Sequence, residues 1–355
     1  MEVISHLQTK SFPAHRHRSS LSLPIINAGV QVLLSLGVDQ EQLQKDWGVR
    51  LSSLRDPYRR MPSFLARRFW EVAKALSGDP AIGLHAAQQA DPSLMLGVAY
   101  LMELMPDRLS ALRVMARYWP LIAGHLDLDW KQEGRKLRLT LIPNQPLSAA
   151  HEEVDYWCMR QALHLKARPG TPVALLEVHM RRSPPFDPSP WREKIGCNVH
   201  FGASRDELVL DIDALLVSRP AGSAAVCASL EKALEGYALK TEKPSTLESV
   251  AAAVLLGIRD ERSFDMIAAQ HHATTRTLRR ELTREGWGYG DIADVQRRLL
   301  SSDLLLLSKL SISEVADSVG YFEVSNFLRA FRRWYDVTPS EFRKHNVSVL
   351  NSIGR

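Results

Sequence analysis

The chain has 355 residues, which is long for one compact domain, because a domain commonly contains about 150 residues. Its content of 45% hydrophobic and 24% charged residues excludes a disordered or fibrous protein and provides for a sizeable core. The 45 basic and 40 acidic residues leave a net charge of +5, a small excess that favours an anionic partner without indicating where it binds.

The sequence predicts a cytoplasmic protein that uses no cofactor or metal. Its densest apolar segment, Leu94–Met105, has about 12 residues, whereas a membrane-spanning helix needs about 20. The first residues lack the apolar core of a secretion signal, and no glycine-rich phosphate loop is present. Cys158, Cys197 and Cys227 lie far apart, so we expect buried thiols rather than disulfides or a zinc knuckle.

Residues 1–20 are predicted to form a flexible tail, and the segment after them has apolar residues at helical spacing. Capping residues place the ends of several helices. The predicted helices are Pro24–Leu36, which ends at Gly37; Ser63–Leu76; one that begins at Asp79-Pro80 and continues through Gln89; and Leu109–Trp119, which Asp107 caps.

Strand patterns follow from Leu126 onward. Apolar residues alternate with polar ones on both sides of Glu133-Gly134, which predicts a β-hairpin. These alternating segments, mixed with helices, predict an α+β domain over residues 21–225. A helix and linker are expected over residues 226–246. The further predicted elements are a helix over Glu152–Ala167, strands within Val173–Met180 and Val199–Leu210, a proline-rich loop over Ser183–Pro190, and a helix over Ser229–Tyr237.

Residues 247–345 are predicted to be entirely helical, followed by a tail over residues 346–355. One part of this region has the pattern of a helix-turn-helix motif. Ser311-Ile312-Ser313-Glu314 is a capping box that starts a short helix, Ala316 permits close helix contact, and Gly320 permits the turn. A longer helix then runs over Glu323–Tyr335.

A second copy of the same pattern lies earlier in the chain, over Ser263–Gly286. Ala268 corresponds to Ala316, and His271-His272-Ala273 forms the turn without a glycine. The second helix of this copy is predicted over Thr275–Glu285. A connecting helix over Asp291–Leu307, roughly 16 residues and about 24 Å long, separates the two copies. Successive major grooves on one face of DNA are about 34 Å apart, so the two long helices are expected to enter adjacent grooves.

Both long helices have one apolar side and one arginine-rich side. With about 100° between successive residues, Leu278 and Leu282 share a side in the first helix, as do Phe327 and Phe331 in the second. Arg280 corresponds to Arg329 on the opposite side. An arginine-rich side is also typical of a solvated helix, but two copies in register favour DNA binding. The predicted DNA-binding residues are Thr275, Arg276, Thr277, Arg279, Arg280, Thr283, Arg284, Ser325, Asn326, Arg329, Arg332 and Arg333.

The C-terminal region closely resembles the AraC/XylS family of bacterial transcription regulators. The resemblance is carried by Ser311–Arg343, which contains SNF, RAFRRW and TPSEFR, and by Thr274–Gly286, TTRTLRRELTREG. Asp336 departs from the family, which usually has glycine there; a left-handed backbone costs more with aspartate than with glycine. Thr338-Pro339-Ser340-Glu341 is a further capping box.

The N-terminal half resembles the branch of this family that has an arabinose-binding-like regulatory domain. The resemblance implies double-stranded promoter DNA as partner, a homodimer formed through the N-terminal domain, activation through contact with RNA polymerase, and a small-molecule effector of unknown identity. The matching segments are Leu36-Gly37-Val38, Gly78–Leu84, Gly97–Tyr100, Ala111-Leu112-Arg113 and Phe201-Gly202-Ala203.

An enzyme or ligand-binding protein whose C-terminal helices serve a protein partner remains the alternative. His151–Asp155 lacks the second histidine of a zinc protease motif. Cys158 lies near His151 and His164, but their spacing on one helix gives no activated thiol. Six residues have the chemistry of an effector pocket, but the sequence favours a core position about threefold for each, so none is predicted as a ligand contact: Trp130, Tyr156, Trp157, Arg160, His164 and His179.

Overall fold

The computed structural model describes residues 18–56, 58–90, 95–144, 147, 149–166, 172–259 and 264–344. The predicted tail over residues 346–355 and all but the end of the tail over residues 1–20 lie outside these ranges. Two compact units divide the chain after Lys243. None of the described helices is both long and apolar enough to span a membrane.

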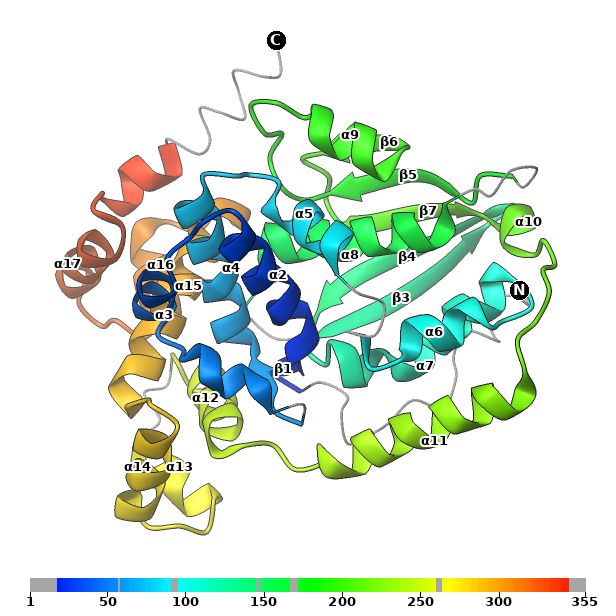
Figure 1. Ribbon diagram of the computed structural model, residues 1–355. Helices are drawn as coiled ribbons and strands as arrows, with labels where there is room; N and C mark the ends of the chain where they lie inside the picture. Colours follow the sequence, from blue (N-terminus) through cyan, green and yellow to red (C-terminus); the bar gives the residue numbers. More distant parts are fainter. Residues whose placement is uncertain are drawn as a thin grey trace. The chain divides into compact units, whose positions relative to one another are not determined.

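The first unit combines helices with a two-stranded antiparallel sheet and a five-stranded mixed sheet (Figure 1). Its helices are α2 (Leu23–Ser35), α3 (Gln40–Trp47), α4 (Ser63–Ser77), α5 (Ile82–Gln89), α6 (Val98–Glu103), α7 (Arg108–Ile122), α8 (His151–Leu165), α9 (Ser189–Ile195), α10 (Ile212–Leu215) and α11 (Ala224–Lys240), with a 3-10 turn at Leu51–Arg55.

A five-stranded sheet has the order β3-β4-β7-β5-β6. The predicted hairpin is confirmed: β3 (Leu126–Glu133) and β4 (Lys136–Pro143) pair antiparallel, and Gly134 has φ +61° in the turn. The strands β5 (Leu175–Met180) and β6 (Asn198–Phe201) pair in parallel, whereas β7 (Asp206–Asp211) is antiparallel to its neighbours. The predicted strand segment Val199–Leu210 therefore covers most of two strands, β6 and β7.

A two-stranded sheet joins β1 (Ser20–Ser22) to β2 (Arg60–Pro62). Ser20 is thus part of a strand and not of a tail. Arg60 is buried and donates to the hydroxyl and carbonyl of Ser20 and to the carbonyl of Leu121. Charge-assisted bonds to buried carbonyls offset the cost of burying this guanidinium.

The helix ends follow the capping residues in most places. Gly37 has φ +83°, and Val38 N donates to Leu33 O, as expected for a helix that ends at a left-handed residue. Asp107 accepts from Ser110 N and caps α7. The predicted start at Asp79-Pro80 is wrong: α5 begins at Ile82, because the Asp79 carboxylate accepts from Ala81 N in a tight turn instead.

The second unit consists of helices in the described part of the chain. They are α12 (Thr246–Leu256), α13 (Phe264–Gln270), α14 (Thr275–Arg284), α15 (Tyr289–Leu307), α16 (Ile312–Ser318) and α17 (Val324–Tyr335), followed by a helical segment at residues 339–344. In Figure 1, α14 lies below α15 and α17 lies beside it. The predicted fold class, an α+β domain joined to a helical domain with two helix-turn-helix motifs, is confirmed.

A single aromatic cluster organises the end of the second unit. Phe331 is buried, and its ring centroid lies 4.7 Å from that of Tyr335, 5.4 Å from that of Phe342 and 5.7 Å from that of Phe327. Aromatic rings at these separations attract one another beyond the area that they bury. This cluster fixes α17 on α16 and on the final helical segment.

Candidate nucleic-acid interface

The motif formed by α16 and α17 begins with the predicted capping box. Glu314 N donates to Ser311 Oγ over 3.2 Å, and Ser311 N donates to Glu314 Oε2 over 2.7 Å. The backbone N–H of Ser311, and after it the Ser311 side chain, hold the pKa of the Glu314 carboxyl below its usual range, because they stabilise its charged form. Gly320 has φ +78°, and a Cβ atom there would stand 2.1 Å from the carbonyl oxygen of Ile258. The turn therefore requires glycine for its backbone angle and for its close contact.

The motif formed by α13 and α14 has the same turn without a glycine. His272 has φ +50° and its N donates to Ala269 O over 3.0 Å, as Gly320 N donates to Asp317 O over 3.0 Å. Ala273 N donates to Ala268 O over 3.0 Å, and Tyr321 N donates to Ala316 O over 2.9 Å. The two turns have equivalent hydrogen bonds, which the sequence did not reveal because histidine rarely adopts a left-handed backbone.

The apolar sides of both helices are buried and the arginine sides are exposed. Leu278 and Leu282 in α14, and Phe327 and Phe331 in α17, are each at most 1% exposed. Apolar burial on this scale fixes the rotation of each helix about its axis. The predicted residues on the other side are all exposed: Arg276, Arg280, Thr283, Arg284, Ser325, Asn326, Arg329, Arg332 and Arg333.

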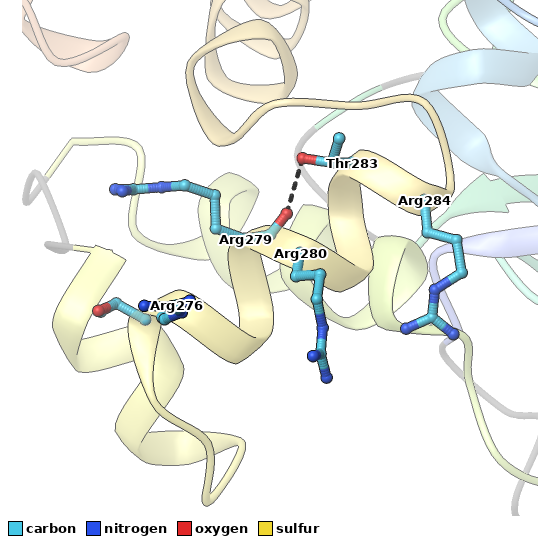
Figure 2. Close-up of a pocket in the computed structure, with 6 residues that line it drawn as sticks. Arg276, Arg279, Arg280, Thr283 and Arg284 are labelled. Carbon is cyan, nitrogen blue, oxygen red and sulfur yellow. Dashed lines mark hydrogen bonds between the residues drawn. The ribbon is translucent and has the colours of Figure 1, made fainter.

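The arginines of α14 line an open groove with Thr275 and Thr283 (Figure 2). Arg276, Arg280 and Arg284 have no ion-pair or hydrogen-bond partner among the residues that the structure describes. In Figure 2 the Arg280 and Arg284 side chains extend to one side of the helix, whereas Arg279 extends to the other. The Arg279 guanidinium lies 5.5 Å from the centroid of the Phe264 ring.

Glu281 and Glu285, near the C-terminal end of α14, accept hydrogen bonds from the start of α12. Thr246 Oγ1 donates to Glu281 Oε2 over 2.9 Å, and Leu247 N donates to Glu285 Oε1 over 3.2 Å. Carboxylates are favourable at a helix N-terminus, where backbone N–H groups carry positive partial charge. Both negative charges are therefore used in packing and leave the exposed side of α14 cationic.

The threonines near the start of α14 also have local partners. Thr274 caps the helix by accepting from Thr277 N over 3.2 Å, and its hydroxyl lies 3.0 Å from that of Thr277. Thr283 Oγ1 donates to the carbonyl of Arg279 over 2.9 Å. Of the predicted site residues in α14, Thr277 is thus engaged in the cap, and Arg279 stacks on a neighbouring ring.

Two arginines of α17, Arg329 and Arg333, are hydrogen-bonded to neighbouring side chains. Arg329 Nη2 donates to Asn326 Oδ1 over 2.6 Å. Arg333 Nη2 donates to Asp294 Oδ1 over 2.6 Å, and Trp334 Nε1 donates to Asp294 Oδ2 over 2.9 Å. The ion pair of Arg333 with Asp294 is exposed, and such pairs contribute about 0–1 kcal/mol, so a phosphate can replace the carboxylate at small cost.

Both halves of the chain match known protein families. Residues 37–218 match the family described as "Arabinose-binding domain of AraC transcription regulator, N-term". Residues 267–345 match a helix-turn-helix domain. The chain belongs to the AraC family of transcription regulators. It is a DNA-binding transcription regulator, as the predicted resemblance implied.

The chain is similar in sequence to two other regulators and in structure to a third. The AraC-family chain is 24% identical over 319 residues to the ornithine utilization regulator of Pseudomonas aeruginosa, an overlap of 89% of this chain and 94% of that protein. It is 31% identical over 157 residues to the regulator VirS of Mycobacterium tuberculosis, covering 44% of this chain and 46% of VirS. The crystal structure of the regulator CdpR from P. aeruginosa matches 86% of this chain and 97% of its own, with 20% identity and a TM-score of 0.40.

The residues considered for enzyme chemistry lie in unsuitable surroundings. Cys158 is fully buried, and burial raises the pKa of its thiol well above the usual range, so a thiolate nucleophile is disfavoured. Burial lowers the pKa of His151 to about 3. The expected burial is confirmed for Cys158 but is wrong for Cys197 and Cys227, which are partly exposed.

The structure separates the residues considered for an effector pocket. Tyr156 and Trp157 belong to the core, and Trp130 and His179 lie on strands of the five-stranded sheet. Arg160 and His164 come together at a cavity of about 190 Å³. The cavity is also lined by Met95, Ala99, Met102, Glu103, Gln161 and Leu163.

Proposed function

We propose that this regulator activates transcription by inserting α14 and α17 into successive major grooves of promoter DNA. The observation that carries the proposal is the pair of exposed arginine sides on two helices joined by α15. That connecting helix is about 28 Å long at 1.5 Å per residue, comparable with the roughly 34 Å between successive grooves. A guanidinium can bond a guanine edge or a phosphate through two parallel N–H groups.

The proposed contacts have two kinds of role. Arg280 and Arg329, at the centres of the exposed sides, contact base edges or clamp phosphates. Thr277 and Arg279 act by positioning the helix, since their side chains engage the cap and the Phe264 ring. The remaining proposed contacts flank the central pair: Thr275, Arg276, Thr283, Arg284, Ser325, Asn326, Arg332 and Arg333.

The first unit is proposed to form a homodimer and to respond to a small-molecule effector. The match to the arabinose-binding family supports a sensing role, and the cavity beside Arg160 and His164 is a candidate space for a small ligand. We further propose that the protein acts in the cytoplasm, contacts RNA polymerase, and functions by binding alone, without catalysis. If the regulator is an activator, deletion of its gene should lower the expression of a reporter placed behind one of its target promoters.

The DNA contacts are tested by fluorescence anisotropy on sites first recovered by selection from random duplexes. We expect Arg280→Ala and Arg329→Ala each to weaken specific binding by about 1–3 kcal/mol if they contact bases. Loss of a phosphate contact instead weakens binding to all sequences and lowers the salt slope by about one. The matched control is Arg259→Ala, which removes an exposed arginine of the same unit that pairs with Asp317.

If both variants bind DNA as tightly as the wild type does, Arg280 and Arg329 do not belong to the contact surface. A loss as large in Arg259→Ala would show a general charge effect instead of a groove contact. The homodimer is tested separately by light scattering on the full chain, where a monomeric mass at high concentration contradicts it.

A further inference from the structure

Two histidines and a glutamate meet on the polar side of the sheet in the first unit. The parallel pairing of β5 with β6 sets Glu177 opposite Asn198 and His179 opposite His200. Side chains alternate along a strand, so these four residues share one side of the sheet. Val178 and Val199, which lie between them, are buried on the other side. The backbone register therefore fixes the three titratable groups next to one another.

The ligand atoms of this cluster are close enough to share one ion. Glu177 Oε2 lies 3.2 Å from His179 Nε2 and 3.7 Å from His200 Nε2. The two imidazole rings stack with centroids 4.6 Å apart. All three ligand atoms lie within 4.8 Å of one another. Two ligand atoms at about 2.1 Å from a tetrahedral ion are about 3.4 Å apart, a value between the two distances to the carboxylate oxygen.

We propose that Glu177, His179 and His200 bind a divalent transition-metal ion, for which Zn²⁺ is the best match. Two imidazole nitrogens and one carboxylate oxygen are a donor set that zinc uses in proteins, with a fourth position open to water or a ligand. The site lies at the edge of the sheet, where β6 pairs only with β5 in the described chain. A bound ion would cross-link this edge strand to its neighbour.

The neighbouring charges leave the carboxylate available. Lys136 Nζ lies 3.3 Å from Glu177 Oε1, so the other oxygen faces the histidines. Glu207 is the partner of His179 on β7, but its carboxylate accepts from Arg138 and from Thr140. Arg138 is thus paired with Glu207 and does not compete for Glu177. Lys136 pairs with Glu177 itself, but this ion pair is exposed and weak, so it leaves the carboxylate free to bind an ion.

No motif in the sequence indicates this site, and the sequence analysis predicted no metal. His179 and His200 are far apart along the chain, and their pairing depends on the register of β5 against β6. A metal motif is recognised in sequence by short spacings between ligands, which only Glu177 and His179 have. The inference is independent of the proposed DNA contacts, which belong to the other unit.

The test is isothermal titration calorimetry, in which ZnCl₂ is added to the full chain. Any purification tag is removed beforehand, and a chelator strips bound metal. The wild type should bind one zinc ion per chain at this site, and zinc should raise its unfolding midpoint, because a ligand of the native state stabilises it. His200→Gln should weaken zinc binding at least about tenfold, since even loss of a hydrogen-bonded partner of a metal ligand costs 10- to 100-fold.

His85→Gln is the matched control. His85 Nδ1 lies 2.5 Å from Asp79 Oδ2, a histidine–carboxylate pair that the described residues do not extend to a third donor. This variant should keep the zinc affinity of the wild type. Glu177→Gln serves as a second variant if His200→Gln unfolds at a lower temperature without zinc. Zinc binding by both variants at the wild-type affinity, or an equal loss in His85→Gln, would overturn the proposal.

Discussion

Replacing Gly320 by alanine should strongly destabilise the second unit. A left-handed backbone with a Cβ atom costs about 1–2 kcal/mol. The added Cβ would also stand 2.1 Å from the Ile258 carbonyl oxygen, which is backbone and cannot rotate away. Overpacking that forces such shifts typically costs about 1–3 kcal/mol. The two contributions together predict a loss of about 2–5 kcal/mol in the free energy of unfolding.

Gly286→Ala is the natural control for this prediction. Gly286 has φ +87°, but nothing lies within 4 Å of a Cβ atom built there. This variant should lose only the backbone contribution of about 1–2 kcal/mol. The difference between the two variants therefore measures the contact between Gly320 and the Ile258 carbonyl.

Hydrogen exchange of peptides from α16 and α17 in the full chain reports this stability without interference from the first unit. Thermal unfolding gives a second measure, with a midpoint that falls by roughly 4–8 °C for each kcal/mol lost in a domain of this size. Equal losses in Gly320→Ala and Gly286→Ala would refute the reasoning, since they would show that the close approach has no energetic cost.

Three further substitutions probe the second unit. Asp336→Gly should raise its stability by up to about 1 kcal/mol in urea unfolding, because Asp336 has φ +58°; unchanged or lower stability would contradict this. Ser311→Ala should cost about 1 kcal/mol by removing the cap of α16, whereas Ser313→Ala, with no capping bond, should cost much less. The capping-box contribution should also fade as the pH falls below about 4, since the depressed pKa of Glu314 makes its charged form the stabilising one. Phe331→Ala should cost about 3–5 kcal/mol and abolish DNA binding in mobility-shift assays; retained binding would show that the aromatic cluster does not hold α17 in place.

The sequence predicted the second unit better than the first. Its helices have strong apolar periodicity and explicit caps, such as Ser311 with Glu314, so local signals and packing agree. The turn at His272 was the weak point, because the left-handed backbone there is imposed by hydrogen bonds and not by residue type. Leu278 and Phe327 were correctly placed on the buried sides.

In the first unit, the helix α3 was missed although Asp39 caps its start and Gly48 ends it, whereas the missed strands lack local signals. The strands β1 and β2 are three residues each and pair across a long stretch of sequence, held partly by the buried Arg60. The helix α9 begins inside the predicted loop, because Pro190 near its start suits a first helical turn as well as a loop. The cluster of His179 and His200 depends on strand register, which only the folded sheet supplies.

Arg329 in α17 has a hydrogen-bond partner and Arg280 in α14 has none among the described residues, and this difference has a consequence for operator sequences. On the proposed mode of binding, Arg329 is already oriented by Asn326, so DNA contact costs it little of the roughly 0.5–1.5 kcal/mol that immobilising a free side chain requires. Arg280 is unrestrained among the described residues and can settle on more than one base step. On the proposed mode of binding, the half-site under α17 should tolerate fewer base changes than the degenerate half-site under α14.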